Sequence, residues 1–340
     1  MTDTIDTLKL TDSPEGIAKA AELIKQGEVV GIPTETVYGL GADALDPKAV
    51  SRIFAAKNRP MDNPLIVHIY SIEQVDGLSN DVPKLFYTLA DKFWPGPLTM
   101  IVPKSQRVPK ETSGGLDTVG IRMPSHPVIR ELIKLSTPIA APSANRSGYP
   151  SPTTAEHVYR DMKGRISAVI DGGECRFGVE STVICFENEK TVRILRPGSV
   201  TEKMLSEYAD VIIDEAILHD LQKGRAAPSP GMKYKHYSPK ADVKIVEGSM
   251  EQFADYTNGK CGEDVYCLIF DNDSADTLKC KALTYGADST QQAHELFAKL
   301  RELDDIKAKT VYVRSPDKTG VGLAVYNRLL RAAAFEVIKP

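Results

Sequence analysis

Residues Lys57–Ile69 read KNRPMDNPLIVHI, and this stretch decides how the first half of the chain is interpreted. It begins with two cations, Lys57 and Arg59, at the end of a helical pattern. Pro60 ends that helix because it lacks a backbone donor and disfavours helical backbone in the residue before it. The apolar run Leu65–Ile69, which contains one histidine, predicts a buried strand. Two cations at a helix-to-strand junction suit an anionic ligand, although the same residues also favour a solvated helix C-terminus.

The composition is that of a globular protein with room for two domains. The chain has 340 residues, of which 42% are hydrophobic and 26% charged. Its net charge of −4 argues against coating nucleic acid by bulk electrostatics. Neither a signal-peptide pattern nor an apolar run of ~20 residues is present, so we expect no membrane association. The cysteines form no CxxC pair, so we expect no metal site and reduced thiols in a cytoplasmic protein (Cys175, Cys185, Cys261, Cys267 and Cys280).

A second unusual stretch, PTETVYGLGAD, follows the predicted strand GEVVGIP. Thr34, Thr36 and Tyr38 supply hydroxyl groups, and Gly39 and Gly41 let a backbone approach a ligand closely. The stretch is either a ligand-binding loop or a polar strand end with a turn.

The strand TVGIRMP carries Arg122 among apolar neighbours. A buried guanidinium without an anionic partner costs several kcal/mol. The partner is either a structural carboxylate or an acidic substrate, and the strand itself does not decide between them.

Strands and helices alternate along the first two thirds of the chain. Helices are predicted at residues 13–26, 47–57, 82–93 and 127–135, with strands between and after them. Polar groups gather where strands begin or end, as in Ser143 and Asn145 of PSAN, Ser181 of GVESTV and Arg196 of RPG. This pattern predicts an α/β sheet with a ligand crevice along one edge.

The alternation breaks in AAPSPGMKYKHYSPKAD, which is rich in Pro, Gly and Ser and predicts a linker between domains. We expect a catalytic domain at 1–214, a linker that serves as a lid at 215–240, and a second domain at 241–340. Helices predicted at 250–256, 290–303 and 323–334 alternate with strands. The second domain is therefore expected to be a smaller Rossmann-like or flavodoxin-like parallel α/β unit.

Taken together, PTETVYGLG, KNRPMDNPL, the Arg122 strand, PSAN, GVESTV and RPG resemble, in their order, the threonylcarbamoyl-AMP synthases of the Sua5/YrdC family. The PSPGMKYKHYSP linker resembles that of the long, two-domain Sua5 form. The resemblance implies a twisted, mixed YrdC-like sheet in the first domain. It also implies a nucleotidyltransferase reaction in which L-threonine, bicarbonate and ATP give threonylcarbamoyl-AMP and pyrophosphate. The product is then handed to a tRNA threonylcarbamoyl transferase complex, and a weak direct contact with tRNA is left open.

The resemblance also implies the site residues. L-Threonine is expected to bind at Thr36, His68, Arg122, the backbone of Ala141, and Ser181. ATP is expected to bind at Lys57, Arg59, Asn63, Thr118, Ser143, Asn145, Ser151, Arg196 and Tyr234. Lys57 and Arg59 are expected to be catalytic through charge stabilisation, with no protein metal ligand and with Mg²⁺ held mainly by the substrate phosphates.

Two other functions are weighed against this one. A non-catalytic module that binds double-stranded RNA or tRNA is the main alternative, and the acidic net charge disfavours it. A carbamoyltransferase of the hydrogenase-maturation type shares related domains, but this chain has no acylphosphatase-like segment and no zinc-finger cysteines.

Overall fold

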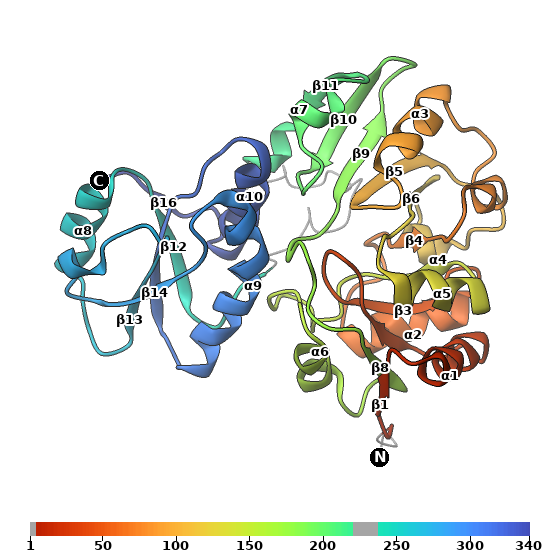
Figure 1. Ribbon diagram of the computed structural model, residues 1–340, viewed down its shortest axis with the longest axis horizontal. Helices are drawn as coiled ribbons and strands as arrows, with labels where there is room; N and C mark the ends of the chain where they lie inside the picture. The colour runs from red at the N-terminus through yellow and green to blue at the C-terminus, as the bar shows by residue number, and fades with distance from the viewer. Residues whose placement is uncertain (1–4, 220–236) are drawn as a thin grey trace.

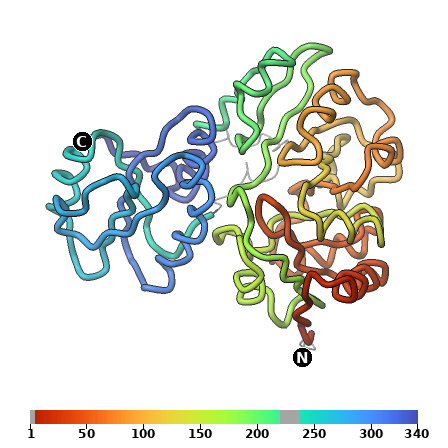
Figure 2. The backbone as a smooth tube through the Cα atoms, in the orientation of Figure 1, coloured from red at the N-terminus to blue at the C-terminus, as the bar shows by residue number. Residues whose placement is uncertain are grey.

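A computed structural model describes residues 5–219 and 237–340 of the chain. Figure 1 shows the described residues in two parts, a larger one formed by the first two thirds of the chain and a smaller one formed by the last third. The chain ends lie in different parts, with the C-terminus on the side of the smaller part away from the larger one (Figure 2). None of the described helices is long and apolar enough to cross a membrane.

The larger part is built on a mixed sheet. Among the described residues, eleven strands lie in the order β1-β8-β2-β3-β7-β4-β6-β5-β9-β10-β11, with parallel and antiparallel pairs interspersed. They are β1 (Leu8–Thr11), β2 (Val30–Ile32), β3 (Gly39–Asp43), β4 (Ile66–His68), β5 (Leu98–Pro103), β6 (Thr118–Arg122), β7 (Ile139–Ala140), β8 (Ala168–Asp171), β9 (Thr182–Phe186), β10 (Thr191–Arg196) and β11 (Asp210–Ile213).

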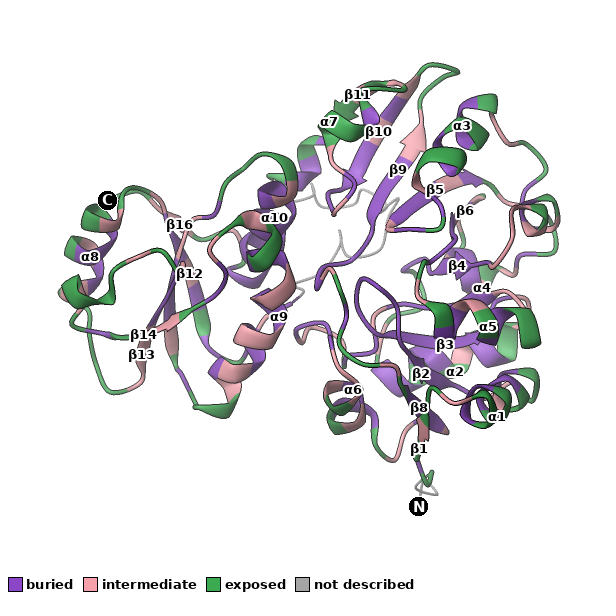
Figure 3. Cartoon of the chain, viewed as in Figure 1, coloured by how far each residue is buried: buried purple, intermediate pink, exposed green. Residues whose placement is uncertain are grey.

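Helices cover both faces of this sheet. They are α1 (Pro14–Lys25), α2 (Pro47–Lys57), η1 (Ile72–Gly77), α3 (Lys84–Phe93), α4 (Lys110–Ser113), α5 (Pro127–Leu135), α6 (Ala155–Met162), α7 (Glu202–Leu205) and η2 (Glu215–Ile217). Ile24 of α1 and Ile129 of α5 belong to one apolar cluster, and Ile53 of α2 and Phe86 of α3 belong to another. Figure 3 shows the strands between these layers as largely buried, as expected for a sheet covered on both faces.

The helix that leads into the opening stretch has clear start and stop signals. Asp46 precedes α2 and accepts a hydrogen bond from the backbone of Lys48 at 2.8 Å, with a proline in the first turn. The helix ends at Lys57, as predicted, because Asn58 adopts a left-handed conformation with φ 52°. The chain then turns into β4, which places Lys57 and Arg59 beside the sheet.

The smaller part contains a parallel sheet, which confirms the predicted architecture. The described strands lie in the order β14-β13-β15-β12-β16, and all their pairs are parallel. Val311 and Val313 of β15 face the cluster formed with α9 and α10, while Tyr312 faces the cluster formed with α8. The elements are β12 (Asp242–Val246), α8 (Met250–Asn258), β13 (Val265–Ile269), η3 (Ala275–Thr277), β14 (Lys281–Thr284), α9 (Ser289–Asp305), β15 (Thr310–Arg314), α10 (Gly320–Ala332) and β16 (Val337–Ile338).

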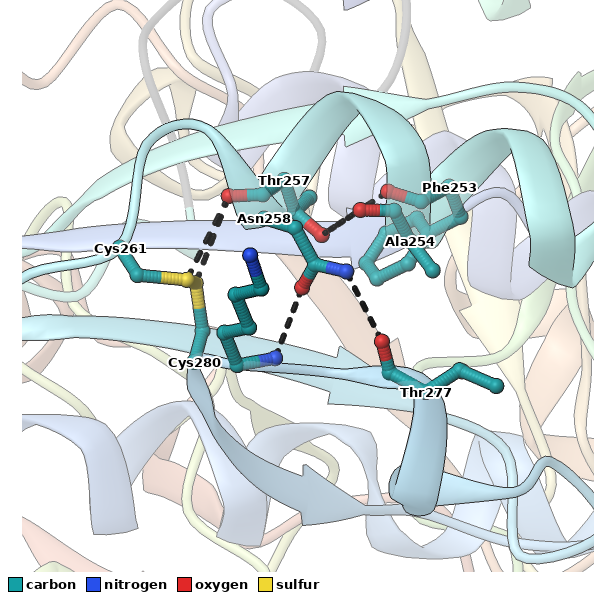
Figure 4. The surroundings of a disulfide bond; sticks show 8 residues. Phe253, Ala254, Thr257, Asn258, Cys261, Thr277 and Cys280 are labelled. Atoms are coloured by element: carbon teal, nitrogen blue, oxygen red, sulfur yellow. Dashed lines mark hydrogen bonds between the residues drawn. A yellow bond between two sulfur atoms is a disulfide. The ribbon is translucent and has the colours of Figure 1, made fainter.

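The expectation that every cysteine is a free thiol is wrong for two of them. Cys261 follows α8 and Cys280 precedes β14, and they form a disulfide with their Cα atoms 5.0 Å apart. Figure 4 shows both sulfurs near the carbonyl of Thr257 and the side chain of Asn258 bridging the same two segments. The pairing depends on how α8 packs on the sheet, so a sequence separation of 19 residues gave no signal for it. The described free thiols are Cys175, Cys185 and Cys267.

The two parts are docked through buried contacts. Figure 1 shows α9 and α10 as the helices of the smaller part that face the larger one. Val37 and Val179 of the larger part belong to the apolar cluster of the smaller part. Gly178 has φ +73°, and a Cβ atom at this position would lie 2.4 Å from the Cα of His294 on α9. Only glycine allows this approach, so the loop before β9 is held directly against the second domain.

Candidate active site

Loops at the ends of several strands of the large sheet line an open cleft. The mixed order of the strands brings these loops together from distant parts of the sequence, and the sequence predicted such a crevice at one edge of the sheet. The described lining consists of Thr34, Thr36, Val37, Gly39, Arg59, Ile66, His68, Arg122, Ala141, Pro142, Ser143, Glu180, Ser181, Arg196 and Tyr237.

The cleft contains eight of the residues predicted for the two substrate sites. These are Thr36, Arg59, His68, Arg122, Ala141, Ser143, Ser181 and Arg196. The structure therefore places all five residues of the predicted threonine set and three of the nine residues of the predicted ATP set in one space. Their roles in binding stay predictions.

Arg122, at the end of β6, has a carboxylate partner within the protein. Its Nη2 atom lies 2.6 Å from Oε1 of Glu35, and both side chains are 4% exposed. It also donates to Thr36 Oγ1 at 3.0 Å and, through Nε, to the carbonyl of Gly96 at 3.2 Å. Burial is the largest influence on the pKa of Glu35 and raises it, but the charge of Arg122, its hydrogen bond and two backbone hydrogen bonds together lower it overall, so the pair is ionic. Of the two partners considered for this arginine, the structure shows the structural carboxylate.

His68 lies beside Arg122 because β4 and β6 pair in parallel with these two residues in register. Burial, and then the charge of Arg122, lower the pKa of His68 to about 3. The imidazole is therefore neutral near pH 7. Its Nδ1 atom is buried and has no hydrogen-bond partner among the described residues. A neutral ring with a free nitrogen can serve a ligand in the cleft as donor or acceptor.

Arg196, at the end of β10, and Ser181, just before β9, also line the cleft. Arg196 donates to the carbonyl of Ser181 at 3.0 Å and to its Oγ at 3.1 Å. Ser181 Oγ also lies 2.8 Å from Thr99 Oγ1. These contacts fix the guanidinium of Arg196 while leaving it on the cleft surface.

Lys57 is held behind the cleft and does not belong to its described lining. Its ammonium donates to the carbonyls of Ser143 and Asn145, at 2.6 Å for the latter. Ser143 Oγ donates to Asn145 Oδ1 at 2.6 Å, so the lysine and the asparagine both hold the turn that carries Ser143. Burial, and next the charge of Arg59, lower the pKa of Lys57 well below its usual value. In this structure Lys57 positions the PSAN turn.

The remaining predicted residues lie around the cleft or outside the described chain. Thr118 lines a smaller cavity that shares Ile66 with the cleft. The side-chain amide of Asn63 is buried and has no hydrogen-bond partner among the described residues. Ser151 donates to Glu180 at 2.5 Å. Tyr234, together with most of the predicted lid, lies outside the described residues.

The sequence analysis did not assign roles in the site to Glu35, Glu180 or Tyr237. Glu35 and Glu180 stand directly beside predicted residues in the PTETVYG and GVESTV motifs, and their acidic character within hydroxyl-rich loops was the available signal. Tyr237 is the described linker tyrosine that lines the cleft, with its ring 5.2 Å from that of Phe297. It was noticed as part of the linker, but no local pattern separates it from Tyr234.

The fold and the cleft define a two-domain α/β protein with a ligand site at strand ends of its larger sheet. Residues 22–198 match the Sua5_yciO_yrdC model, which is described as telomere recombination. Residues 200–334 match the Sua5_C model, described as the threonylcarbamoyl-AMP synthase C-terminal domain. The chain therefore belongs to the Sua5/YciO/YrdC family, and it contains both domains of the longer form. This confirms the resemblance found in the motifs.

Similar proteins match nearly the full length. A threonylcarbamoyl-AMP synthase of Pyrococcus abyssi is 44% identical over 94% of this chain and 94% of its own. One from Bacillus subtilis is 43% identical over 99% of this chain and 98% of its own. The crystal structure of Pyrococcus abyssi Sua5 complexed with L-threonine superposes with a TM-score of 0.89 at 41% identity, covering 98% of this chain and 99% of that one.

Proposed function

We propose that this protein is a nucleotidyltransferase that converts L-threonine, bicarbonate and ATP into threonylcarbamoyl-AMP and pyrophosphate. The observation that carries the proposal is the charge of the cleft. Its described lining contains Arg59, Arg122 and Arg196 but one carboxylate, Glu180. Such a site suits a ligand with several negative charges. The names of the full-length relatives and the threonine-bound relative support the identity of the substrates.

Threonine is proposed to bind at the Arg122 side of the cleft. A guanidinium has five N–H donors, and Arg122 makes one contact each through Nε, Nη1 and Nη2. The remaining donors are available to the threonine carboxylate. Thr36, neutral His68, Ser181 and the backbone of Ala141 line the same cleft and can bind its other polar groups. Glu35 holds the guanidinium in place, so the arginine is oriented before the substrate arrives.

The triphosphate is proposed to bind at Arg59, Arg196 and the turn that contains Ser143. Lys57 and Asn145 hold that turn, and Asn63, Thr118, Ser151 and Tyr234 complete the proposed ATP set. The threonine amine and bicarbonate form a carbamate with loss of water. A carbamate oxygen then attacks the α-phosphorus, and pyrophosphate leaves with the electrons of the broken P–O bond. The cations offset the charge that develops on the phosphate oxygens, and no covalent protein intermediate is needed.

Mg²⁺ is proposed to enter with the nucleotide. The described residues contain no cluster of three or more His, Cys, Asp or Glu side chains placed to hold a metal. Glu180, the carboxylate of the described lining, has its two oxygens engaged by Ser151 and Arg328. These residues fit a metal whose ligands come mainly from phosphate and water. The bound ion would reduce the repulsion between the carbamate and the triphosphate.

The proposed product is a mixed anhydride, which hydrolyses readily and is activated for transfer to an acceptor. We propose that a tRNA threonylcarbamoyl transferase complex takes it up in the cytoplasm, with at most a weak direct contact between this protein and tRNA.

The test is pyrophosphate release from ATP by the full-length protein, with threonine and bicarbonate omitted in turn. We expect release only when both are present, and an adenylate product that contains the threonine carbon skeleton by mass spectrometry. Equal release without threonine would contradict the proposal. RNA binding that weakens steeply with salt, without any pyrophosphate release, would instead favour the RNA-binding alternative.

A further inference from the structure

The carboxylate of the cleft is held by a residue of the second domain. Glu180 lies in the loop before β9 and is 6% exposed. Its Oε1 atom accepts a hydrogen bond from Ser151 Oγ at 2.5 Å, and its Oε2 atom accepts one from Arg328 Nε at 3.0 Å. Arg328 is on α10, so the second domain reaches the wall of the cleft through this side chain.

Arg328 also donates hydrogen bonds to the backbone of two segments that carry cleft residues. It is 0% exposed, and its Nη2 atom donates to the carbonyl of Glu180 at 3.2 Å. Its Nη1 atom donates to the carbonyl of Pro197, directly after β10. One guanidinium therefore fixes the residues that precede β9 and follow β10. These are the strand ends that carry Ser181 and Arg196.

Arg196 is the cation next to this carboxylate. Its described hydrogen bonds go from Nε and Nη2 to Ser181, and the described residues provide none for Nη1. Burial lowers the pKa of Arg196 to about 10, and the nearby groups Tyr237 and then Glu180 oppose that shift. Glu180 and Arg196 thus interact electrostatically without forming an ion pair. Ser151 and Arg328 occupy the two carboxylate oxygens instead.

We propose that Arg328 is a positioning residue of the active site, which binds Glu180 and so keeps Arg196 free to bind an anion in the cleft. A buried carboxylate that loses its cation is strongly destabilised. Without Arg328, Glu180 would turn to the adjacent Arg196, and the cleft would lose one of its anion-binding groups. The identity of the anion as a nucleotide phosphate rests on the proposed function, but the charge argument applies to any polyphosphate.

A second buried arginine crosses the same domain boundary and serves as the matched control. Arg301 on α9 binds Asp161 of α6 through two hydrogen bonds of 2.7 and 3.2 Å, and donates to the carbonyl of Pro150 at 2.6 Å. It is 6% exposed. Asp161 does not line the cleft. Arg301 therefore reproduces the docking contacts of Arg328 without touching a cleft residue.

The experiment compares full-length Arg328→Gln, Arg328→Gln/Glu180→Gln and Arg301→Gln with the unmodified protein. Titration calorimetry measures the affinity for inorganic pyrophosphate and for ATP, and urea unfolding measures stability. We expect Arg328→Gln to weaken pyrophosphate binding about tenfold to hundredfold, as for one lost charge-assisted contact. The double variant should recover most of that loss because it removes the competing carboxylate. Arg301→Gln should lower stability and leave the affinity unchanged.

Several outcomes would overturn the proposal. If folded Arg328→Gln bound pyrophosphate as tightly as the unmodified protein, Arg328 would be only a docking residue. The same conclusion would follow if Arg301→Gln lost as much pyrophosphate affinity as Arg328→Gln. A loss that the double variant does not recover would contradict the role of Glu180. If Arg328→Gln is insoluble, Arg328→Lys takes its place, with a smaller expected loss and Arg301→Lys as its control.

Pyrophosphate binding is measured without threonine or turnover. A failure of the proposed reaction would therefore leave this test intact and be recognised separately. If the unmodified protein bound neither pyrophosphate nor ATP, the cleft would not be an anion-binding site and the proposal would be wrong.

Discussion

The two domains use their buried arginines differently. In the larger domain, Arg122 and Arg196 lie at strand ends and line an open cleft. In the smaller domain, Arg301 and Arg328 lie on helices and bind carboxylates and carbonyls of the other domain. All four side chains are almost completely buried. Burial of an arginine therefore does not by itself distinguish a ligand site from a docking contact.

The difference comes from where sheets and helices direct their side chains. Strand ends converge on one edge of a sheet, so cations placed there share a space that a ligand can enter. Helix faces pack against a fixed surface, so their cations meet protein oxygens at short range. The distinguishing feature is that Arg122 and Arg196 line the cleft, whereas Arg301 and Arg328 are not among its described lining residues.

The largest expected effect separates these two uses directly. Arg122→Ala and Arg301→Ala should each lower the free energy of unfolding by about 3–5 kcal/mol, because each leaves a buried carboxylate without its cation. Only Arg122→Ala should also weaken threonine binding, by about a hundredfold or more. Urea unfolding and calorimetric titration with threonine measure the two quantities. If Arg122→Ala weakened ATP binding as much as threonine binding, its assignment to the threonine side would be wrong.

Removing the disulfide tests whether a change inside the smaller domain, away from its docking helices, affects ligand binding in the cleft. Replacing both Cys261 and Cys280 with serine should lower the free energy of unfolding by about 3 kcal/mol, because the crosslink restricts the unfolded chain. Threonine affinity should stay the same, since the bond lies between α8 and β14 and not at the docking helices. Mass spectrometry of protein purified without reductant should show the crosslink. The serine variant itself should be insensitive to dithiothreitol, and a shift in its stability on reduction would point to a different thiol.

Lys57 tests a residue that positions the cleft from behind. Lys57→Ala removes two hydrogen bonds to the PSAN turn. We expect turnover with ATP to become slower because the activation free energy rises by about 1.5–3 kcal/mol, as for lost hydrogen bonds from a charged group. Threonine affinity should change less. Lys48→Ala, an exposed change on the same helix, should have no effect. An unchanged rate in Lys57→Ala would show that the turn does not depend on the lysine.

The pH dependence of stability tests the neutral histidine beside Arg122. The pKa of His68 is about 3 in the folded protein and near 6.5 ordinarily, so between these values the unfolded chain binds one more proton. The free energy of unfolding should therefore decrease as pH falls below 6.5, by about 1.4 kcal/mol per pH unit from this residue. Urea unfolding of the native protein and of His68→Gln between pH 7 and 5 should show a shallower slope in the variant. Parallel slopes would mean that His68 binds protons equally in the folded and unfolded states, so that folding does not lower its pKa.

Much of the fold was determined by local sequence patterns. Helical spacing, capping residues and prolines predicted α1, α2, α3 and α5, and apolar runs predicted the main strands of both sheets. These signals depend on neighbours within a few residues, so they survive without tertiary information. The short elements β1, α6, β11, β14 and β16 were not predicted, because edge strands and short helices carry few apolar residues and are stabilised by what they pack against.

The ordered motifs indicated eight residues of the described cleft lining, but not how those residues are paired. Three pairings depend on contacts between distant segments. Glu35 pairs with Arg122, Lys57 holds the PSAN turn, and Cys261 is bonded to Cys280. The bond between Glu180 and Arg328 joins residues 148 positions apart, in different domains. The local apolar pattern indicated the burial of one charge, Arg122, while the burial of Glu180 and Arg328 followed from packing. Only the packed structure decides which opposite charge each one meets, because that choice depends on distances set by the docking of whole helices and strands.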